Sequence, residues 1–399
     1  MSLRRVAVLA AFLLPLTVVP TASAGCGFMN NSVCPQPPVA DPGARVPGTP
    51  VAQVKQVGKA TAGAPNAING NIRPTKVFGT PDAGVVPVVG AVDARADNGS
   101  YVMYESRVDE RTIDLMVWSV GLQGPAPVRV QLPPSWGTDK ARTYPGLFLL
   151  HGGAEPADYQ AWSVYSQFKQ RVGNLEALVV MPSSGIGGHT TDYVNFGYNA
   201  GKQYGTFVRT ELMQILHRGY ALGEKSAVAG VSAGARSALE VAYKDPADFV
   251  AAGSYSGLLD TQILGIEQSI TLGPASQALT PFEMWGHPYL NRNIWEDRNP
   301  TRNLTKLRAI KLFVSAGDGA QGPLDRKPIA DVFEAVVAPS TASFIRAAKS
   351  ARLDVTAFTG EHGTHRWPYF DREFGRSLPT LLAPLGLTPQ AQPEPFKID

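Results

Sequence analysis

The 399-residue sequence has few of the features that mark nucleic-acid-binding or membrane-embedded proteins. Its net charge is only +3, and Lys and Arg form no long run, so nothing favours nucleic acid as a partner. No apolar run reaches the roughly 20 residues that a membrane span requires. Only two cysteines are present, Cys26 and Cys34, and they lie close together near the N-terminus. They predict one disulfide in an exported protein, which leaves the chemistry to other side chains.

The N-terminus has the pattern of a secretory signal peptide. Arg4 and Arg5 precede the apolar run Val6–Val19, and small residues follow up to Ala24. This pattern predicts cleavage near Ala24 and a secreted or cell-envelope location. A buried N-terminal helix and a lipid-modified Cys26 are the alternatives.

The remaining chain divides into three parts by composition. Residues 25–100 are rich in Pro, Gly and Ala and predict an extended arm without long helices. Residues 101–386 alternate apolar strand patterns with helical ones and predict the catalytic domain. Residues 387–399 are polar and Pro-rich and predict a disordered tail.

The pattern over residues 101–386 indicates an α/β fold with a mostly parallel central sheet covered by helices on both faces. Buried strands are expected at PGLFLLHGG, ALVVMP, SAVAGV, FVAAGSYSG, IKLFVSAGDG and LDVTAFTG, and PVRVQLPPSW is typical of an edge strand. Active sites of such sheets lie beyond the carboxyl ends of the strands. Several Gly-rich segments fall at those ends.

The segment AVAGVSAGAR places Ser232 between Gly230 and Gly234, after a strand and before a helix. A sharp strand-to-helix turn strains its central residue and crowds neighbouring chain segments, so it needs small residues around it. The G-x-S-x-G pattern in this context predicts an α/β-hydrolase nucleophile elbow, with Ser232 as the nucleophile. A structural turn with an uninvolved serine is the alternative.

A serine nucleophile needs a base and an orienting acid, in the chain order Ser, acid, His. His362 and His365 follow the last expected strand, and Gly363 gives the loop freedom to place His365. Asp318 and Glu334 are both candidate acids, and spacing alone slightly favours Asp318. The residues themselves leave that choice open.

The oxyanion hole requires two hydrogen-bond donors directed at the developing negative charge. One is the backbone amide of Ala233, which follows the nucleophile. The other is expected from the loop His151–Gly153, where glycines let the backbone approach the substrate. This chemistry requires no metal and no organic cofactor.

Several segments together resemble the secreted mycolyltransferases of mycolic-acid bacteria, the antigen 85 and corynomycolyltransferase group, and the related esterase-D-like α/β-hydrolases. The matching segments are FLLHGGAEPADYQAW, which ends in Trp162, TDYVNFG, GVSAGARSAL, EMWGHPYLNRNIWEDRNP and HGTHRWPYF. The resemblance implies Ser232 as nucleophile, His365 as base and Glu334 as acid. Asp318, which spacing favours, is the alternative acid. It also implies Gly153 and the residue after Ser232 as oxyanion-hole donors.

The resemblance implies a substrate site around His151, Ala154, Trp162, Arg366 and Trp367. His151 and Ala154 stand where trehalose-using members have an Asp and an Arg, and Arg366 replaces a small residue, so the acceptor is open. We expect a serine acyltransferase that moves a long, mycolate-type acyl group from an acyl ester glycolipid or lipid to a cell-envelope glycan or another hydroxyl. A carboxylesterase that uses water is the first alternative. A non-catalytic wall-binding protein is the second.

Overall fold

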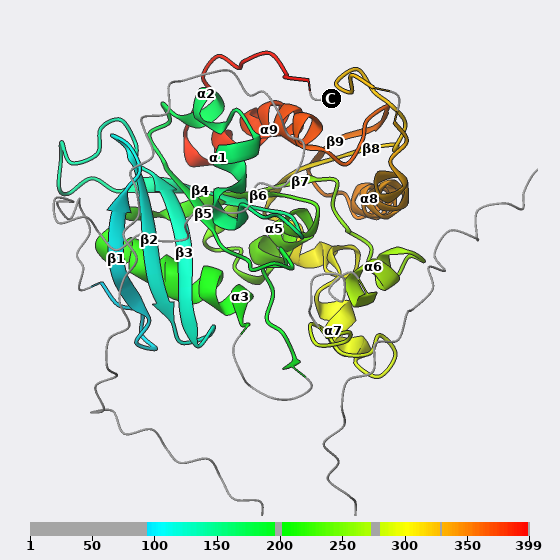
Figure 1. Ribbon diagram of the computed structural model, residues 1–399, viewed down its shortest axis with the longest axis horizontal. Helices are drawn as coiled ribbons and strands as arrows, with labels where there is room; N and C mark the ends of the chain where they lie inside the picture. Colours follow the sequence, from blue (N-terminus) through cyan, green and yellow to red (C-terminus); the bar gives the residue numbers. More distant parts are fainter. Residues whose placement is uncertain (1–93, 196–201, 273–279, 328, 398–399) are drawn as a thin grey trace, which may run out of the picture. The chain divides into compact units, whose positions relative to one another are not determined.

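The computed structural model describes residues 94–195, 202–272, 280–327 and 329–397 (Figure 1). The expected signal peptide, the Cys26–Cys34 pair and most of the expected arm lie outside these residues. Within them, no helix is both long and apolar enough to cross a membrane.

The described chain forms a nine-stranded sheet in the order β1-β2-β3-β5-β4-β6-β7-β8-β9. The strands β4 to β9 pair in parallel, whereas β1, β2 and β3 form an antiparallel extension that joins the sheet at β5. The predicted mostly parallel sheet is therefore confirmed. The bounds are β1 Tyr101–Arg107, β2 Thr112–Ser119, β3 Gly124–Gln131, β4 Tyr144–Leu150, β5 Leu178–Pro182, β6 Leu222–Val231, β7 Phe249–Tyr255, β8 Lys311–Gly317 and β9 Val355–Glu361.

The prediction of an edge strand at PVRVQLPPSW is wrong, because β3 pairs with β2 on one side and β5 on the other. Pairing with β5 begins only at Val128, so Pro125 and Pro127 lie beyond it. The N–H groups that Pro125 and Pro127 lack are therefore not needed for hydrogen bonds between β3 and β5. The strands β1 and β2 were not anticipated, and β1 is the edge on this side.

Helices cover both faces of the sheet, and each face has its own apolar core. Alternate residues of β4 divide between the cores: Phe148 and Leu150 face one, Leu147 and Leu149 the other. The first core is covered by α3–α4, α5 and α8, and the second by α1, α2 and α9 (Figure 1). The bounds are α1 Ala161–Tyr165, α2 Phe168–Val172, α3 Tyr204–Thr206, a π-helical stretch Phe207–Leu212, α4 Met213–Gly219, α5 Ala233–Lys244, α6 Ile266–Leu272, α7 Arg292–Asp297, α8 Val332–Ser350 and α9 Trp367–Leu382.

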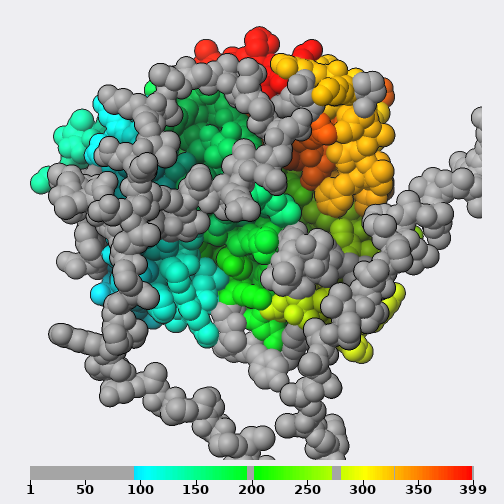
Figure 2. Space-filling model, in the orientation of Figure 1, coloured from blue at the N-terminus to red at the C-terminus, as the bar shows by residue number. Residues whose placement is uncertain are grey.

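The prediction of a disordered tail is wrong for residues 387–397. Leu387 and Phe396 pack against the core beneath α1, α2 and α9. The Gln392 side chain accepts a hydrogen bond from the buried Arg171 guanidinium at 3.2 Å. Apolar contacts of the segment, together with hydrogen bonds of the Gln390 and Gln392 side chains, hold it on the domain beside α2. In the space-filling view, the N-terminal strands (cyan) lie at the left of the described surface, the orange segments at the right and the red C-terminal segment along the top (Figure 2).

Candidate active site

The loops that follow β4, β6, β7, β8 and β9 meet at one edge of the sheet. Because these strands are parallel neighbours, their carboxyl ends come together there. Ser232 directly follows β6, Ser256 follows β7, and His365 lies between β9 and α9. Residues far apart in the sequence are thereby brought to one site.

Ser232 stands on a strained strand-to-helix turn, with φ 54° and ψ −119°. The turn presses neighbouring chain segments together. A Cβ at Gly230 would lie 2.3 Å from the Gly234 carbonyl oxygen, and a Cβ at Gly234 would lie 2.3 Å from the His151 carbonyl oxygen. These two glycines are therefore a steric requirement of the turn. Backbone strain of this kind costs about 1–3 kcal/mol and is typical of functional sites.

His365 and Glu334 form a close pair: His365 Nδ1 lies 2.6 Å from Glu334 Oε2. Glu334 is fully buried in the first turn of α8. Its other oxygen, Oε1, accepts hydrogen bonds from the Ser256 hydroxyl and the Gly317 amide, each at 2.7 Å. A carboxylate held in this way favours the tautomer with the proton on Nδ1, which leaves Nε2 free to accept one.

Asp318, the acid that spacing favours, pairs with a different histidine. Its Oδ2 lies 2.6 Å from His362 Nδ1, and the His362 side chain is largely exposed. Slight burial opposes ionisation, but the Ala320 amide and His362 outweigh it and hold the pKa of Asp318 below its usual value. The geometry thus brings Glu334 to His365 and leaves Asp318 on the neighbouring His362.

Ser232 and His365 line one cavity of about 390 Å³. The Nε2 of His365 is buried without a hydrogen-bond partner among the described residues. The hydroxyl of Ser232 is therefore not bonded to it in this structure, and such contacts often tighten only with substrate bound. The lining residues are Gly152, Gly153, Ala154, Glu155, Gly187, His189, Ser232, Ala233, Leu258, Ser269, Phe333, His365, Trp367 and Phe370.

Two of the expected oxyanion-hole residues, Gly153 and Ala233, line this cavity, and so do Ala154 and Trp367 from the expected substrate site. Ala233 opens α5, so its N–H has no acceptor within its own helix. The arrangement can bind an acyl carbonyl next to a serine and a histidine. Among the described residues, no group of three His, Cys, Asp or Glu side chains is placed to hold a metal ion.

The structure corrects the expectation that His151 contacts substrate. Its side chain is only 2% exposed and does not line the cavity. Its Nδ1 lies 2.8 Å from the Gly152 carbonyl oxygen, and its Nε2 lies 2.9 Å from both the Ser184 amide nitrogen and Asp158 Oδ1. Burial opposes the imidazolium, but the Asp158 carboxylate outweighs it and raises the pKa of His151. His151 therefore shapes the glycine loop from beneath.

Trp162 and Arg366 also do not line the cavity. Trp162 is buried, donates from its indole N–H to the Leu150 carbonyl at 3.2 Å, and meets Trp367 edge-on with ring centroids 5.2 Å apart. It supports Trp367 from behind. Arg366 directly precedes α9, and its neighbour Trp367 is the side chain that reaches the cavity wall.

Sequence reasoning missed two ionisable residues of the cavity wall, Glu155 and His189. Glu155 Oε1 accepts a hydrogen bond from the Trp367 indole N–H at 3.0 Å. Burial is the larger cause and the positive charge of Arg236 the smaller one, and together they lower the pKa of His189 to about 3, so His189 stays neutral. The position of Glu155 just after Gly152 and Gly153 was a usable signal for it. Nothing local marks His189.

Glu155→Gln is expected to stabilise the fold near neutral pH. Burial raises the pKa of the Glu155 carboxyl above its ordinary 4.5, so the folded state holds that proton more tightly than the unfolded chain. Stability contributed by this group is complete below the unfolded-state pKa and is lost as pH rises through the folded-state pKa. The variant should therefore unfold at a higher temperature than wild type near neutral pH, and the gap should close below about pH 4.5. A gap that is independent of pH would contradict this assignment.

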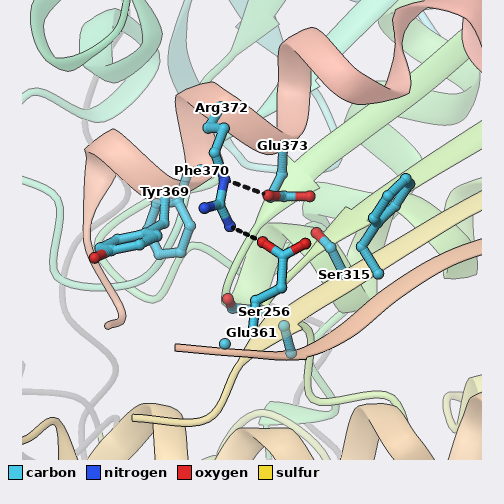
Figure 3. Close-up of a pocket in the computed structure, with 10 residues that line it drawn as sticks. Ser256, Ser315, Glu361, Tyr369, Phe370, Arg372 and Glu373 are labelled. Carbon is cyan, nitrogen blue, oxygen red and sulfur yellow. Dashed lines mark hydrogen bonds and ion pairs between the residues drawn. The ribbon is translucent and has the colours of Figure 1, made fainter. Parts of the chain in front are cut away.

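A second, much smaller cavity of about 10 Å³ lies between β8, β9 and α9. Figure 3 shows Arg372 directed toward Glu361 and Glu373, with Ser256 and Ser315 nearby. This volume is about that of a single water and excludes a substrate. Burial raises the pKa of Glu373, which lines this small cavity. Because the small cavity excludes a substrate, the larger cavity is the candidate active site.

Comparison with known families gives a match over residues 119–381 to the Esterase family, described as "Putative esterase". Among curated proteins, the chain is 30% identical over 266 residues to diacylglycerol acyltransferase/mycolyltransferase Ag85A of Mycobacterium tuberculosis, covering 63% of this chain and 77% of that protein. It is 29% identical over 262 residues to Ag85B of Mycobacterium leprae, covering 62% of this chain and 78% of that protein.

Solved structures show the same fold at lower identity. MPT51 (FbpC1) of Mycobacterium tuberculosis superimposes with a TM-score of 0.55 at 19% identity, covering 67% of this chain and 97% of that one. FphF of Staphylococcus aureus, a fluorophosphonate-binding serine hydrolase, superimposes with a TM-score of 0.52 at 16% identity, covering 68% of this chain and 98% of that one. These matches confirm the predicted α/β-hydrolase-type fold.

Proposed function

The chain belongs to the Esterase family and to the antigen 85 group of acyltransferase/mycolyltransferases, and on that premise we propose that it transfers an acyl group between hydroxyls through an acyl-enzyme on Ser232. It is an enzyme of the serine acyltransferase/esterase type. The observation that carries the residue roles is the 2.6 Å contact between the buried Glu334 and His365, which lines the same cavity as Ser232.

The first half-reaction forms the acyl-enzyme. Ser232 Oγ attacks the carbonyl carbon of the donor ester while His365 Nε2 takes the hydroxyl proton. The backbone amides of Gly153 and Ala233 stabilise the oxyanion, and removing one such donor typically costs about a hundred- to a thousand-fold in rate. The bond from carbon to the alcohol oxygen then breaks. The imidazolium returns its proton to the leaving alcohol.

The second half-reaction reverses these roles. An acceptor hydroxyl gives its proton to His365 Nε2 and attacks the acyl carbon. The carbon–Oγ bond breaks, and Ser232 regains the proton from His365. Glu334 orients the ring and stabilises the imidazolium.

The finer identity of the substrate is part of the same proposal. The Ag85 relatives are named as diacylglycerol acyltransferases and mycolyltransferases, which favours a long-chain acyl ester as donor. The sequence signature of residues 1–24 favours secretion to the cell envelope, where a glycolipid, wall glycan or other hydroxyl would be the acceptor. The sequence resemblance puts Ala154, which lines the cavity, where trehalose-using members carry a charged residue, so we propose an acceptor other than trehalose.

Product partition tests the proposal. Purified protein is given a fatty-acyl ester with and without excess alcohol acceptors, including trehalose, and both new ester and free acid are measured. Transfer predicts that new ester forms at the expense of free acid as an acceptor other than trehalose is added. Release of free acid alone, with every acceptor, would overturn transfer in favour of hydrolysis. Absence of both products would overturn the enzymatic roles of these residues.

A further inference from the structure

One carboxylate outside the Ser232–His365–Glu334 set contacts the main chain of two of its members. Asp331 stands just before α8, and its Oδ1 accepts a hydrogen bond from the Glu334 amide at 3.0 Å. Its Oδ2 accepts one from the His365 amide at 2.9 Å. The first contact is an ordinary helix N-cap. The second reaches a segment 34 residues away in the sequence.

The surroundings show that this is more than a helix cap. In a capping box, the Glu334 side chain would turn back to the Asp331 amide. Here the Asp331 amide donates to the Gly319 carbonyl at 2.7 Å, and Glu334 is left to face His365. The Gly319 amide donates in turn to the Gly363 carbonyl at 2.9 Å. Asp331 thus closes a ring of contacts through the β8 loop, the start of α8 and the histidine loop.

We propose that Asp331 is a positioning residue that holds the His365 side chain at hydrogen-bonding distance from Glu334, an inference that rests on the proposed function. The 2.6 Å contact between those side chains depends on two main-chain segments from separate elements. A single rigid carboxylate that holds both backbone amides fixes their separation. Without it the histidine loop can shift, and a displacement of about 1 Å at a catalytic group can cost about a hundredfold in rate.

Two substitutions separate positioning from capping. Ser and Asn cap helices about as well as Asp. Ser has one oxygen on a short side chain, and Asn presents an NH₂ group in place of one carboxylate oxygen, so neither can accept from both amides. Asp331→Ser and Asp331→Asn should therefore retain the wild-type unfolding temperature.

Both variants should lower kcat by up to about a hundredfold with little change in KM. They should slow labelling of Ser232 by a fluorophosphonate in the same proportion. Asp331→Glu, which keeps both oxygens, should recover part of the rate. Asp139→Asn is the matched control, because Asp139 accepts from the Ala141 amide in a turn that does not line the cavity. Asp139→Asn should change neither kcat nor the rate of labelling.

The outcome distinguishes this inference from the proposed function. If Asp331→Ser and Asp331→Asn label and turn over like wild type at unchanged stability, the positioning role is wrong and the function stands. If their rate losses only follow a fall in unfolding temperature, Asp331 is a helix cap and no more. If wild type itself is not labelled at Ser232, the proposed function fails first.

Discussion

Ser232→Ala is expected to lower both acyl transfer and ester hydrolysis by about a millionfold, the loss seen when the nucleophile of a serine enzyme is removed. The reason is chemical, since alanine offers no oxygen on which to form an acyl-enzyme. The fold should remain, because alanine fits the space of serine and the φ of 54° strains both residues alike. Steady-state kinetics and thermal unfolding of the purified variant measure the two effects.

Ser163→Ala is the control for Ser232→Ala. Its hydroxyl is directed toward Met181 Sδ at 3.8 Å, and Ser163 does not line the cavity. This variant should keep wild-type turnover. Activity retained in Ser232→Ala at more than a few per cent of wild type would mean that another group attacks the ester, and the assignment would be wrong.

Glu334→Gln is expected to lower kcat by about ten-thousandfold. The amide cannot hold Nδ1–H as a carboxylate does, so the imidazole takes the wrong tautomer and its charged form loses its partner. Burial makes the effect large, because Glu334 is fully enclosed and no solvent can replace it. The measurement is kcat at the pH optimum, together with circular dichroism to show that α8 persists.

The matched control for Glu334→Gln is Asp318→Asn. Asp318 belongs to an exposed pair with His362, and such pairs contribute little. Turnover should therefore stay close to wild type. The reverse result, with Asp318→Asn inactive and Glu334→Gln active, would assign the acid role to Asp318.

Local sequence indicates only those site residues that have a steric or chemical signature close to them in the chain. Ser232 is marked by Gly230 and Gly234, since the turn needs small residues within a few positions of the serine. The choice between Asp318 and Glu334 is different. Both lie near a carboxyl end of the sheet, each pairs with a histidine, and only the path of the chain decides which histidine it meets.

Burial explains most of the other differences. His151 and Trp162 carry groups that could bind a substrate, and nothing in their immediate sequence reveals that β4 and α1 turn them inward. The pattern of β2 is ambiguous because its core-facing residues Ile113, Leu115 and Val117 alternate with other residues that include the apolar Met116 and Trp118. The composition of the tail, rich in proline and polar residues, does not reveal that Leu387 and Phe396 pack against the core and that Gln392 bonds to Arg171.

Capture of the acyl-enzyme tests the proposed function most directly. Wild-type protein is mixed with a fatty-acyl ester, quenched in acid and digested, and the peptide that contains AVAGVSAGAR is examined by mass spectrometry. We expect one acyl group on Ser232, which is lost and appears as new ester when an alcohol acceptor is added before the quench. An unmodified Ser232, or an acyl group on any other residue that turns over at the rate of catalysis, would contradict it.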